Sequence, residues 1–355
     1  MVHLYPIAAG LTVLIAAHGL RKGSLSLSGA VGALIAGYGT LANPLPTFGV
    51  LLLVFYLTGS RATKVKADVK ARLEREAVSH SRSEDANGVK HKAHAGGQRD
   101  AMQVLCNSLT GFASAVVFRV LYGGELNARS IGPLHISAKA WAGGDGFCAL
   151  APDAGDGWSR TLVLLALGHF ACCMGDTLAS ELGILSRSKP VLVLNPFRQV
   201  PPGTNGGISL FGTLMSLIGG LFMGATAALT TYLSNPACSV SAKSASWLTL
   251  WSAGVHGADR MLWLNIIFLG GLGGLLGSMI DSVLGATFQR TYYSRETKQV
   301  LLGRLPPKKQ SKSGSDDSEW VVITGYDILS NNQVNLISSV ATSALVAYLG
   351  TSVLV

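Results

Sequence analysis

Residues 161–185 read TLVLLALGHFACCMGDTLASELGIL, a run that is apolar over most of its length. A helix needs about 20 such residues to cross a bilayer, so this run predicts a transmembrane span. Further apolar runs follow, separated by polar intervals. The run at residues 46–58 is short for a span, so we expect its helix to continue through Gly59. Together they predict eight spans, at residues 4–20, 25–41, 46–58, 101–122, 161–185, 208–233, 261–289 and 335–355.

The composition agrees with a polytopic membrane protein. Of the 355 residues, 48% are hydrophobic and 13% are charged, whereas soluble proteins average about 25% charged residues. This balance excludes an ordinary soluble enzyme and a disordered chain, and five cysteines are too few for a disulfide scaffold. We therefore expect an all-α integral membrane protein in which residues 1–355 form a single membrane domain in contact with membrane lipid.

Lys and Arg are distributed unevenly between the two sides of the predicted bundle. The connections after the first, third, fifth and seventh spans hold 22 of the 28 Lys and Arg residues. Basic loops stay in the cytosol, so these connections are predicted to be cytosolic and both termini non-cytosolic. The net charge of +9 thus sets orientation and does not indicate nucleic-acid binding. Two cytosolic connections are long and polar, residues 60–99 and residues 290–330, the second with a low-complexity linker.

The first apolar run has no basic region before it and no clear cleavage site, so it is expected to be a retained span and not a signal peptide. We expect the protein to lie in the endoplasmic reticulum or another endomembrane. The oligomeric state is left open by the sequence. Cys148 and Cys238 are the only cysteines in the two large non-cytosolic connections, and we expect a disulfide between them.

Polar side chains occur in the cytosolic thirds of several predicted spans. Ionisable groups at membrane depth are costly, so they mark functional sites or ion pairs. Asp176 and Asp281 lie in the fifth and seventh spans, and Asn107 lies in the fourth. Two carboxylates on neighbouring helices suit Mg²⁺, which prefers oxygen ligands and often shares its coordination with substrate phosphates. The alternative is that each Asp pairs with an Arg or with backbone amides of another helix.

The predicted cytosolic connections also carry residues that suit phosphate. A turn before the sixth span would present backbone N–H groups at the positive end of a helix dipole. Its expected substrate-binding residues, together with Asn195 and Asn107, are Pro202, Gly203, Thr204, Asn205, Gly206 and Gly207. Four basic residues would neutralise a transferring phosphoryl group as catalytic residues: Arg61, Lys64, Arg99 and Arg198.

Two motifs resemble those of the transmembrane protein 19 family: GDTLASELG at residues 175–183 and NPFRQVPPGTNGG at residues 195–207. The likeness extends over nearly the whole chain through residues 59–61, 96–99, 281–286 and 325–332. That family includes the plant phytyl-phosphate kinase of the vitamin E pathway, which converts an isoprenyl monophosphate to the diphosphate. The resemblance implies a phosphotransferase that uses a nucleoside triphosphate, CTP or ATP. From this and the residues above, we expect Asp176 and Asp281 to bind its Mg²⁺.

The chain departs from this family in a polar insertion near residues 82–95. No plastid transit segment precedes the first run, which favours geranylgeranyl or farnesyl phosphate over phytyl phosphate as substrate. Other readings stay open: a cytidylyltransferase-like lipid enzyme, a membrane transporter or lipid scramblase, or a structural membrane partner. A transporter should show repeated halves. The fifth and seventh spans share an Asp followed by Thr or Ser, but the sequence shows no convincing inverted repeat.

Overall fold

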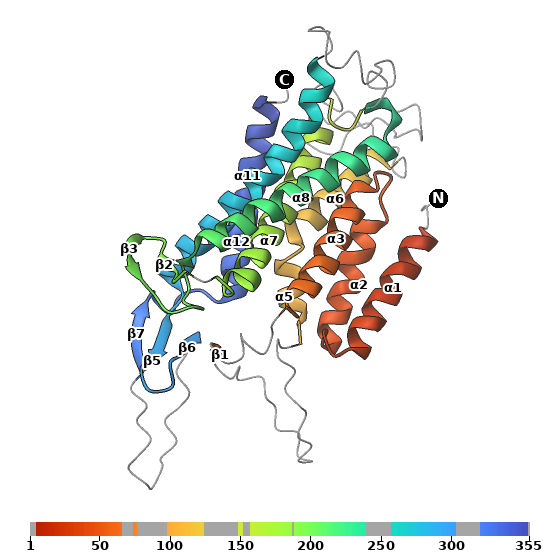
Figure 1. Ribbon diagram of the computed structural model, residues 1–355. Helices are drawn as coiled ribbons and strands as arrows, with labels where there is room; N and C mark the ends of the chain where they lie inside the picture. The colour runs from red at the N-terminus through yellow and green to blue at the C-terminus, as the bar shows by residue number, and fades with distance from the viewer. Residues whose placement is uncertain are drawn as a thin grey trace.

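The computed structural model describes residues 5–65, 74–76, 98–123, 148–151, 157–186, 188–238, 257–302 and 320–353. This part of the chain forms a helical bundle with two small sheets at one end (Figure 1). The predicted all-α membrane fold is confirmed. Its helices are α1 (Pro6–Arg21), α2 (Leu27–Leu41), α3 (Thr47–Ala62), α5 (Ala101–Cys106), α6 (Leu109–Tyr122), α7 (Trp158–Gly183), α8 (Leu210–Ser234), α11 (Gly257–Phe288) and α12 (Asn331–Val353).

Counting α5 and α6 as one crossing, the helices of the described part match the eight predicted spans. Four of them, α7, α8, α11 and α12, are long and apolar enough to cross a membrane, and α1, α2, α3 and α6 are shorter apolar helices. As expected, α3 continues beyond residue 58 and includes Gly59. The predicted span at residues 101–122 is instead interrupted at Asn107 and Ser108. Both residue types hydrogen-bond locally to the backbone, and Ser108 Oγ donates to Val104 O at 2.9 Å.

The helix α7 lies at the centre of the bundle. Its side chains are apolar nearly all round, and most of them are buried against α3, α6, α8, α11 and α12. A helix without a polar face is stable only when other elements or lipid surround it. The central position of α7 therefore follows from its composition. As a result, Asp176 is surrounded by the other helices of the bundle.

Glycines allow α7, α8 and α11 to approach closely. A Cβ added at Gly270 would lie 2.6 Å from Gly220 O, and one added at Gly175 would lie 2.6 Å from Gly274 O. Real side chains do not reach such distances, so only glycine fits at these crossings. Gly175 directly precedes Asp176, and this contact brings the carboxylate close to α11.

Each of two connections folds into a three-stranded antiparallel sheet. Between α7 and α8 the strands β2 (Val191–Leu192), β3 (Asn195–Gln199) and β4 (Gly207–Ile208) pair in the order β3-β2-β4. Between α11 and α12 the strands β5 (Thr291–Ser294), β6 (Gln299–Leu302) and β7 (Trp320–Thr324) pair in the order β6-β5-β7. β1 (Glu74–Glu76) adds to β6 in parallel, so two connections that are distant in sequence meet in one sheet.

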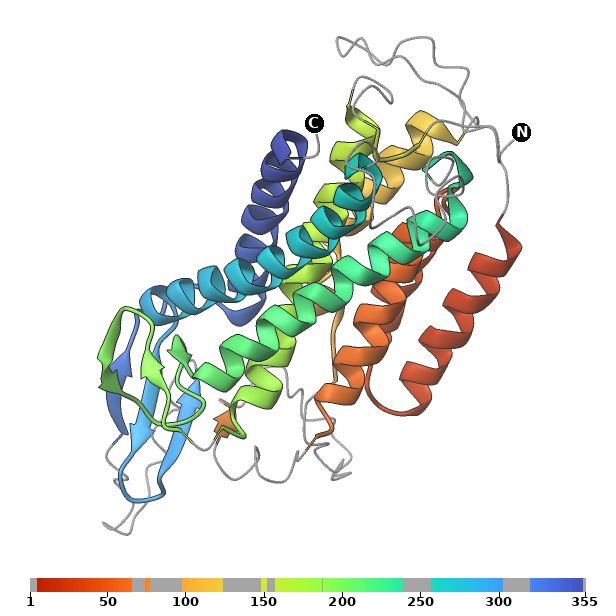
Figure 2. The ribbon, with the colours of Figure 1, turned by 45° about the horizontal axis from the view of Figure 1, so that its top comes forward.

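The bundle contains an internal repeat. The segments α7–β2–β3–β4–α8 and α11–β5–β6–β7–α12 have the same order of elements, and the first strand is central in both sheets. In each segment the first helix runs toward the sheets and the last helix runs away from them (Figure 2). Asp176 and Asp281 lie on the first helix of their respective segments. The two copies run in the same direction, so the repeat is parallel and not inverted.

The first residues of α1 and the last residues of α12 lie at the end of the bundle opposite the sheets (Figures 1 and 2). This placement agrees with an even number of crossings. The expected disulfide between Cys148 and Cys238 is confirmed, and it follows the end of α8 that points away from the sheets.

Candidate functional site

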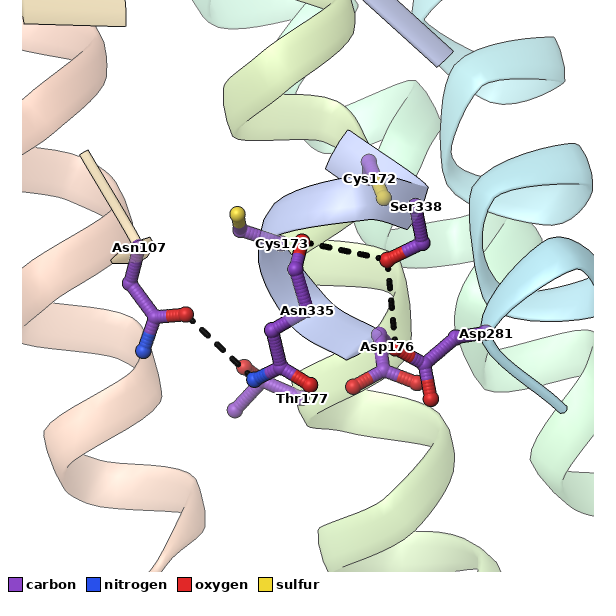
Figure 3. A pocket seen from close by; sticks show the side chains of 8 residues that line it. All are labelled: Asn107, Cys172, Cys173, Asp176, Thr177, Asp281, Asn335 and Ser338. Carbon is purple, nitrogen blue, oxygen red and sulfur yellow. Dashed lines mark hydrogen bonds between the residues drawn. The ribbon is translucent and has the colours of Figure 1, made fainter. Parts of the chain in front are cut away.

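A small pocket lies between α5, α7, α11 and α12 (Figure 3). Asp176 is seven residues before Gly183, the last residue of α7, which places it about 10 Å from the helix end nearest the sheets. The pocket offers about 10 Å³ to the centre of a water-sized sphere, enough for one water molecule or one bare cation. Its lining residues are Asn107, Cys172, Cys173, Asp176, Thr177, Asp281, Asn335 and Ser338.

The structure brings the two predicted metal ligands together. Asp176 and Asp281 point toward the same space from α7 and α11 (Figure 3). Ser338 Oγ donates a hydrogen bond to Asp281 Oδ2 at 3.1 Å. Within the described residues, no donor reaches the carboxylate of Asp176, and no Lys, Arg or His lines the pocket. Two adjacent carboxylates without a counter-charge are costly in a low-dielectric interior, so the pair demands a cation or shares a proton.

The donor atoms of the pocket suit a hard cation. Carboxylate, amide and hydroxyl oxygens surround the space, and these are the ligand types that Mg²⁺ and Ca²⁺ prefer. Among the described residues, no group of three or more His, Cys, Asp or Glu side chains is arranged to hold a metal ion. A cation would therefore be held by two carboxylates and neutral oxygens, with positions left for water or phosphate. The thiols of Cys172 and Cys173 suit softer metals, so they are not ligands for Mg²⁺.

The end of α3 that carries two of the predicted basic residues packs beside the pocket wall. A Cβ added at Gly59 would contact Thr177 Cγ2, which belongs to the pocket wall, at 3.6 Å. Arg61 follows Gly59 by two residues, and Lys64 lies just beyond the helix end; both are exposed. Arg99 Nη1 donates to Ser60 Oγ at 3.4 Å. Burial lowers the pKa of the Arg99 guanidinium, but this group stays charged at neutral pH.

The structure does not bring Arg198 and Asn195 to the pocket. Both lie on the exposed strand β3, away from the lining residues. Arg198 Nη2 donates to Ile323 O on β7 at 2.9 Å, so this arginine joins the two sheets. Asn195 Oδ1 accepts a hydrogen bond from Phe197 N at 3.2 Å.

The turn from Pro202 to Gly207 also stays outside the pocket lining. Gly203 and Gly206 have φ of 87° and 74°, a conformation that glycine adopts without strain. Several of its N–H groups donate within the protein and are not free for phosphate: Thr204 N to Pro201 O at 3.3 Å, Asn205 N to Thr291 Oγ1 at 3.3 Å, and Gly207 N to Thr204 O at 2.9 Å.

The same turn supports α11 next to Asp281. A Cβ added at Gly206 would lie 2.7 Å from Ser282 O, so the turn packs directly on the helix backbone one residue beyond the carboxylate. The N-terminus of α8 is capped by Ser209, whose side chain accepts from Gly212 N at 3.1 Å. The turn thus supports the pocket indirectly, because it helps to fix the position of α11 and of Asp281 on that helix.

Asn335 and Ser338 were not predicted from the sequence, although a signal exists. They belong to a stripe of polar residues along α12, most of them buried, that includes Ser339, Thr342 and Ser343. The spacing i, i+3, i+4, i+7 and i+8 places these side chains on one face of the helix. Thr177, Cys172 and Cys173 lie beside Asp176 on α7 and could have been found from that residue.

A family model described as "Integral membrane protein DUF92" matches residues 10–343. "Protein PGR" of Arabidopsis thaliana is 32% identical over 335 residues, which cover 94% of this chain and 91% of that protein. An "Uncharacterized membrane protein" of Methanocaldococcus jannaschii is 32% identical over 124 residues, or 35% of this chain and 39% of that protein. No solved structure matches the chain.

Proposed function

The chain belongs to the DUF92 integral membrane protein family, as its likeness to the transmembrane protein 19 family predicts, and on this premise we propose that it is a prenyl-phosphate kinase. The kinase transfers the terminal phosphoryl group of CTP or ATP to an isoprenyl monophosphate at the cytosolic face of the membrane. The products are the isoprenyl diphosphate and a nucleoside diphosphate. The observation that supports this proposal best is the pair of carboxylates facing one pocket that no basic side chain of the described residues lines.

Asp176 and Asp281 would hold Mg²⁺, which supplies charge neutralisation between the phosphates when bound. The pocket is small enough that the ion would fill its inner part, so we place the phosphates at its opening. Arg61, Lys64 and Arg99 belong to the adjacent ends of α3 and α5, and we propose that they bind these phosphates. Phosphoryl transfer depends mainly on positioning and charge neutralisation, which these residues provide.

The depth of the pocket suits a substrate with a lipid tail. Asp176 lies about 10 Å from the sheet-side end of α7, close to the level at which lipid headgroups meet the bilayer core. A phosphate at this level would leave its isoprenyl chain in the surrounding lipid. Membrane lipid and an isoprenyl phosphate are thus the expected partners.

The test is product formation by the purified protein in liposomes. Geranylgeranyl phosphate, Mg²⁺ and either CTP or ATP are supplied, and the diphosphate is detected by mass spectrometry. We expect diphosphate from the unchanged protein and from Glu296→Gln, an exposed carboxylate in the β5–β6 turn, but not from Asp176→Asn. Absence of product with several prenyl phosphates and all four nucleotides, from folded protein, would refute the kinase proposal. A CMP-lipid product would instead indicate the cytidylyltransferase alternative.

A transporter or lipid scramblase is the second candidate, and the internal repeat favours it. Repeated halves and an interrupted helix beside a polar pocket are features of many transporters. Transporter sites lie near the bilayer midplane, however, whereas this pocket lies toward one end of the bundle. Flux of labelled isoprenyl phosphate or lipid across the same liposomes, lost in Asp176→Asn, would support this candidate.

A further inference from the structure

The side-chain amide of Asn335 lies among oxygen acceptors. One end of the amide is 3.3 Å from Asn107 Oδ1, and the hydrogen bond between them is drawn in Figure 3. The other end is 3.1 Å from Asn331 O and 3.3 Å from Asp281 Oδ2. An amide has one donor end and one acceptor end, so both ends are satisfied only if Asn107 turns its own amide to donate or if a cation lies among the oxygens.

In the first arrangement of this amide, its nitrogen donates to Asn107. Its oxygen then meets the carbonyl of Asn331 and the carboxylate of Asp281, and the three oxygens repel one another. A cation between them converts this repulsion into coordination, because amide, carbonyl and carboxylate oxygens are its normal ligands. The arrangement therefore suits a pocket that contains an ion.

In the second arrangement, the amide is turned by half a rotation. Its nitrogen then donates to Asn331 O and to Asp281 Oδ2, which offsets the negative charge of the carboxylate. Its oxygen now faces Asn107, which must turn its own amide to present a donor. The two ends of an amide have nearly the same shape, so both side chains can turn without moving the helices. This arrangement suits an empty pocket.

We propose that Asn335 is a further ligand of the cation held by Asp176 and Asp281, and that Asn335 and Asn107 turn together when the ion binds or leaves. This inference rests on the cation site of the proposed function and adds to it a ligand and a means of sensing occupancy. Asn107 is the C-cap of α5, and Arg99 lies two residues before the start of that helix. The state of the amide pair is therefore linked through one short helix to a basic residue placed for phosphate.

The experiment measures thermal unfolding of the full-length protein in detergent during Mg²⁺ titration, with Mn²⁺ and Ca²⁺ in parallel. Asn335→Leu keeps the side-chain size and removes both the oxygen and the donor. We expect it to raise the Mg²⁺ concentration at the midpoint of the stability increase by about tenfold or more. Asn331→Asp is the control for Asn335→Asp, because the exposed side chain of Asn331 adds the same charge to the same helix end without lining the pocket.

Asn335→Asp separates a ligand from a structural residue. It keeps an oxygen for the cation but cannot donate to Asp281, so we expect a lower unfolding temperature without divalent ions and a larger increase with Mg²⁺ than in the Asn331→Asp control. A purely structural asparagine would show a loss without the larger increase.

The outcomes distinguish this inference from the proposed function. If no divalent ion changes the unfolding temperature of the unchanged protein, both the cation site and the role of Asn335 are wrong. If Asp176→Asn abolishes the response while both Asn335 variants respond like the control, the cation site stands and the inference about Asn335 is wrong. If Asn335→Leu does not fold, Asn335→Asp still decides the question.

Discussion

Asp176 and Asp281 face one another across a pocket in which, among the described residues, no basic side chain neutralises them. Removing one of the two charges should relieve their repulsion in the absence of metal. We therefore expect Asp176→Asn to raise the stability of the metal-free protein by about 1 kcal/mol or more, and to abolish the stabilisation by Mg²⁺. The measurement is thermal unfolding with EDTA and with Mg²⁺.

Glu296→Gln is the matched control, because it makes the same chemical change at an exposed site at the sheet end of the bundle. It should leave both the metal-free stability and the Mg²⁺ response unchanged. If Asp176→Asn lowered the stability of the metal-free protein and kept the stabilisation by Mg²⁺, the assignment of the carboxylate pair would be wrong.

Asp176, Asp281 and Asn107 could be predicted from the sequence because polar and charged side chains are costly inside a membrane span. Asn335 and Ser338 could not be distinguished from the many polar residues that help helices pack. The place of Arg198 was also beyond prediction, because it depends on a hydrogen bond to a strand that is 125 positions away in the sequence.

The crossing of α7, α8 and α11 depends on glycines without room for a side chain. A Cβ at Gly274 would lie 2.6 Å from Gly220 Cα of α8. From the other side, Gly175 of α7 also packs against Gly274. We expect Gly274→Ala to separate the helices, destabilise the protein by about 1–3 kcal/mol and weaken Mg²⁺ binding, since Asp176 follows Gly175. Thermal unfolding with Mg²⁺ titration measures both effects.

Gly10→Ala provides the comparison for this substitution. A Cβ at Gly10 on α1 has nothing within 4 Å, so the alanine should be neutral or slightly stabilising. If Gly274→Ala and Gly10→Ala had the same stability and the same Mg²⁺ midpoint, the close crossing would not control the pocket.

The helices could be predicted because long apolar runs have few alternatives in a membrane protein. The sheets could not, because their strands are only 2–5 residues long and lie in polar connections without a clear alternation. The interruption after α5 was missed since an Asn–Ser pair in an apolar run does not by itself end a helix.

At the scale of the complete bundle, the fold and the charge distribution together predict which end faces the cytosol. The start of α1, the end of α12 and the disulfide lie opposite the sheets, whereas the connections at the sheet end hold 22 of the 28 Lys and Arg residues. The sheet end should therefore face the cytosol and the termini the other side. Protease protection of N- and C-terminal tags in sealed microsomes tests this, with a known cytosolic tag as control. Digestion of both terminal tags without detergent would reverse the assigned orientation.

The repeat of helix, sheet and helix has a consequence for the origin of the protein. Duplication and fusion of a gene for one such unit accounts for two copies with the same strand order. A symmetric dimer of the ancestral unit would have offered two identical aspartates. In this chain the surroundings of the two aspartates differ: Asp281 accepts a hydrogen bond from Ser338 of the polar helix α12, whereas the equivalent helix α8 presents glycines. The two aspartates of one polypeptide therefore have unequal surroundings, which suits the proposed transfer between two different phosphates.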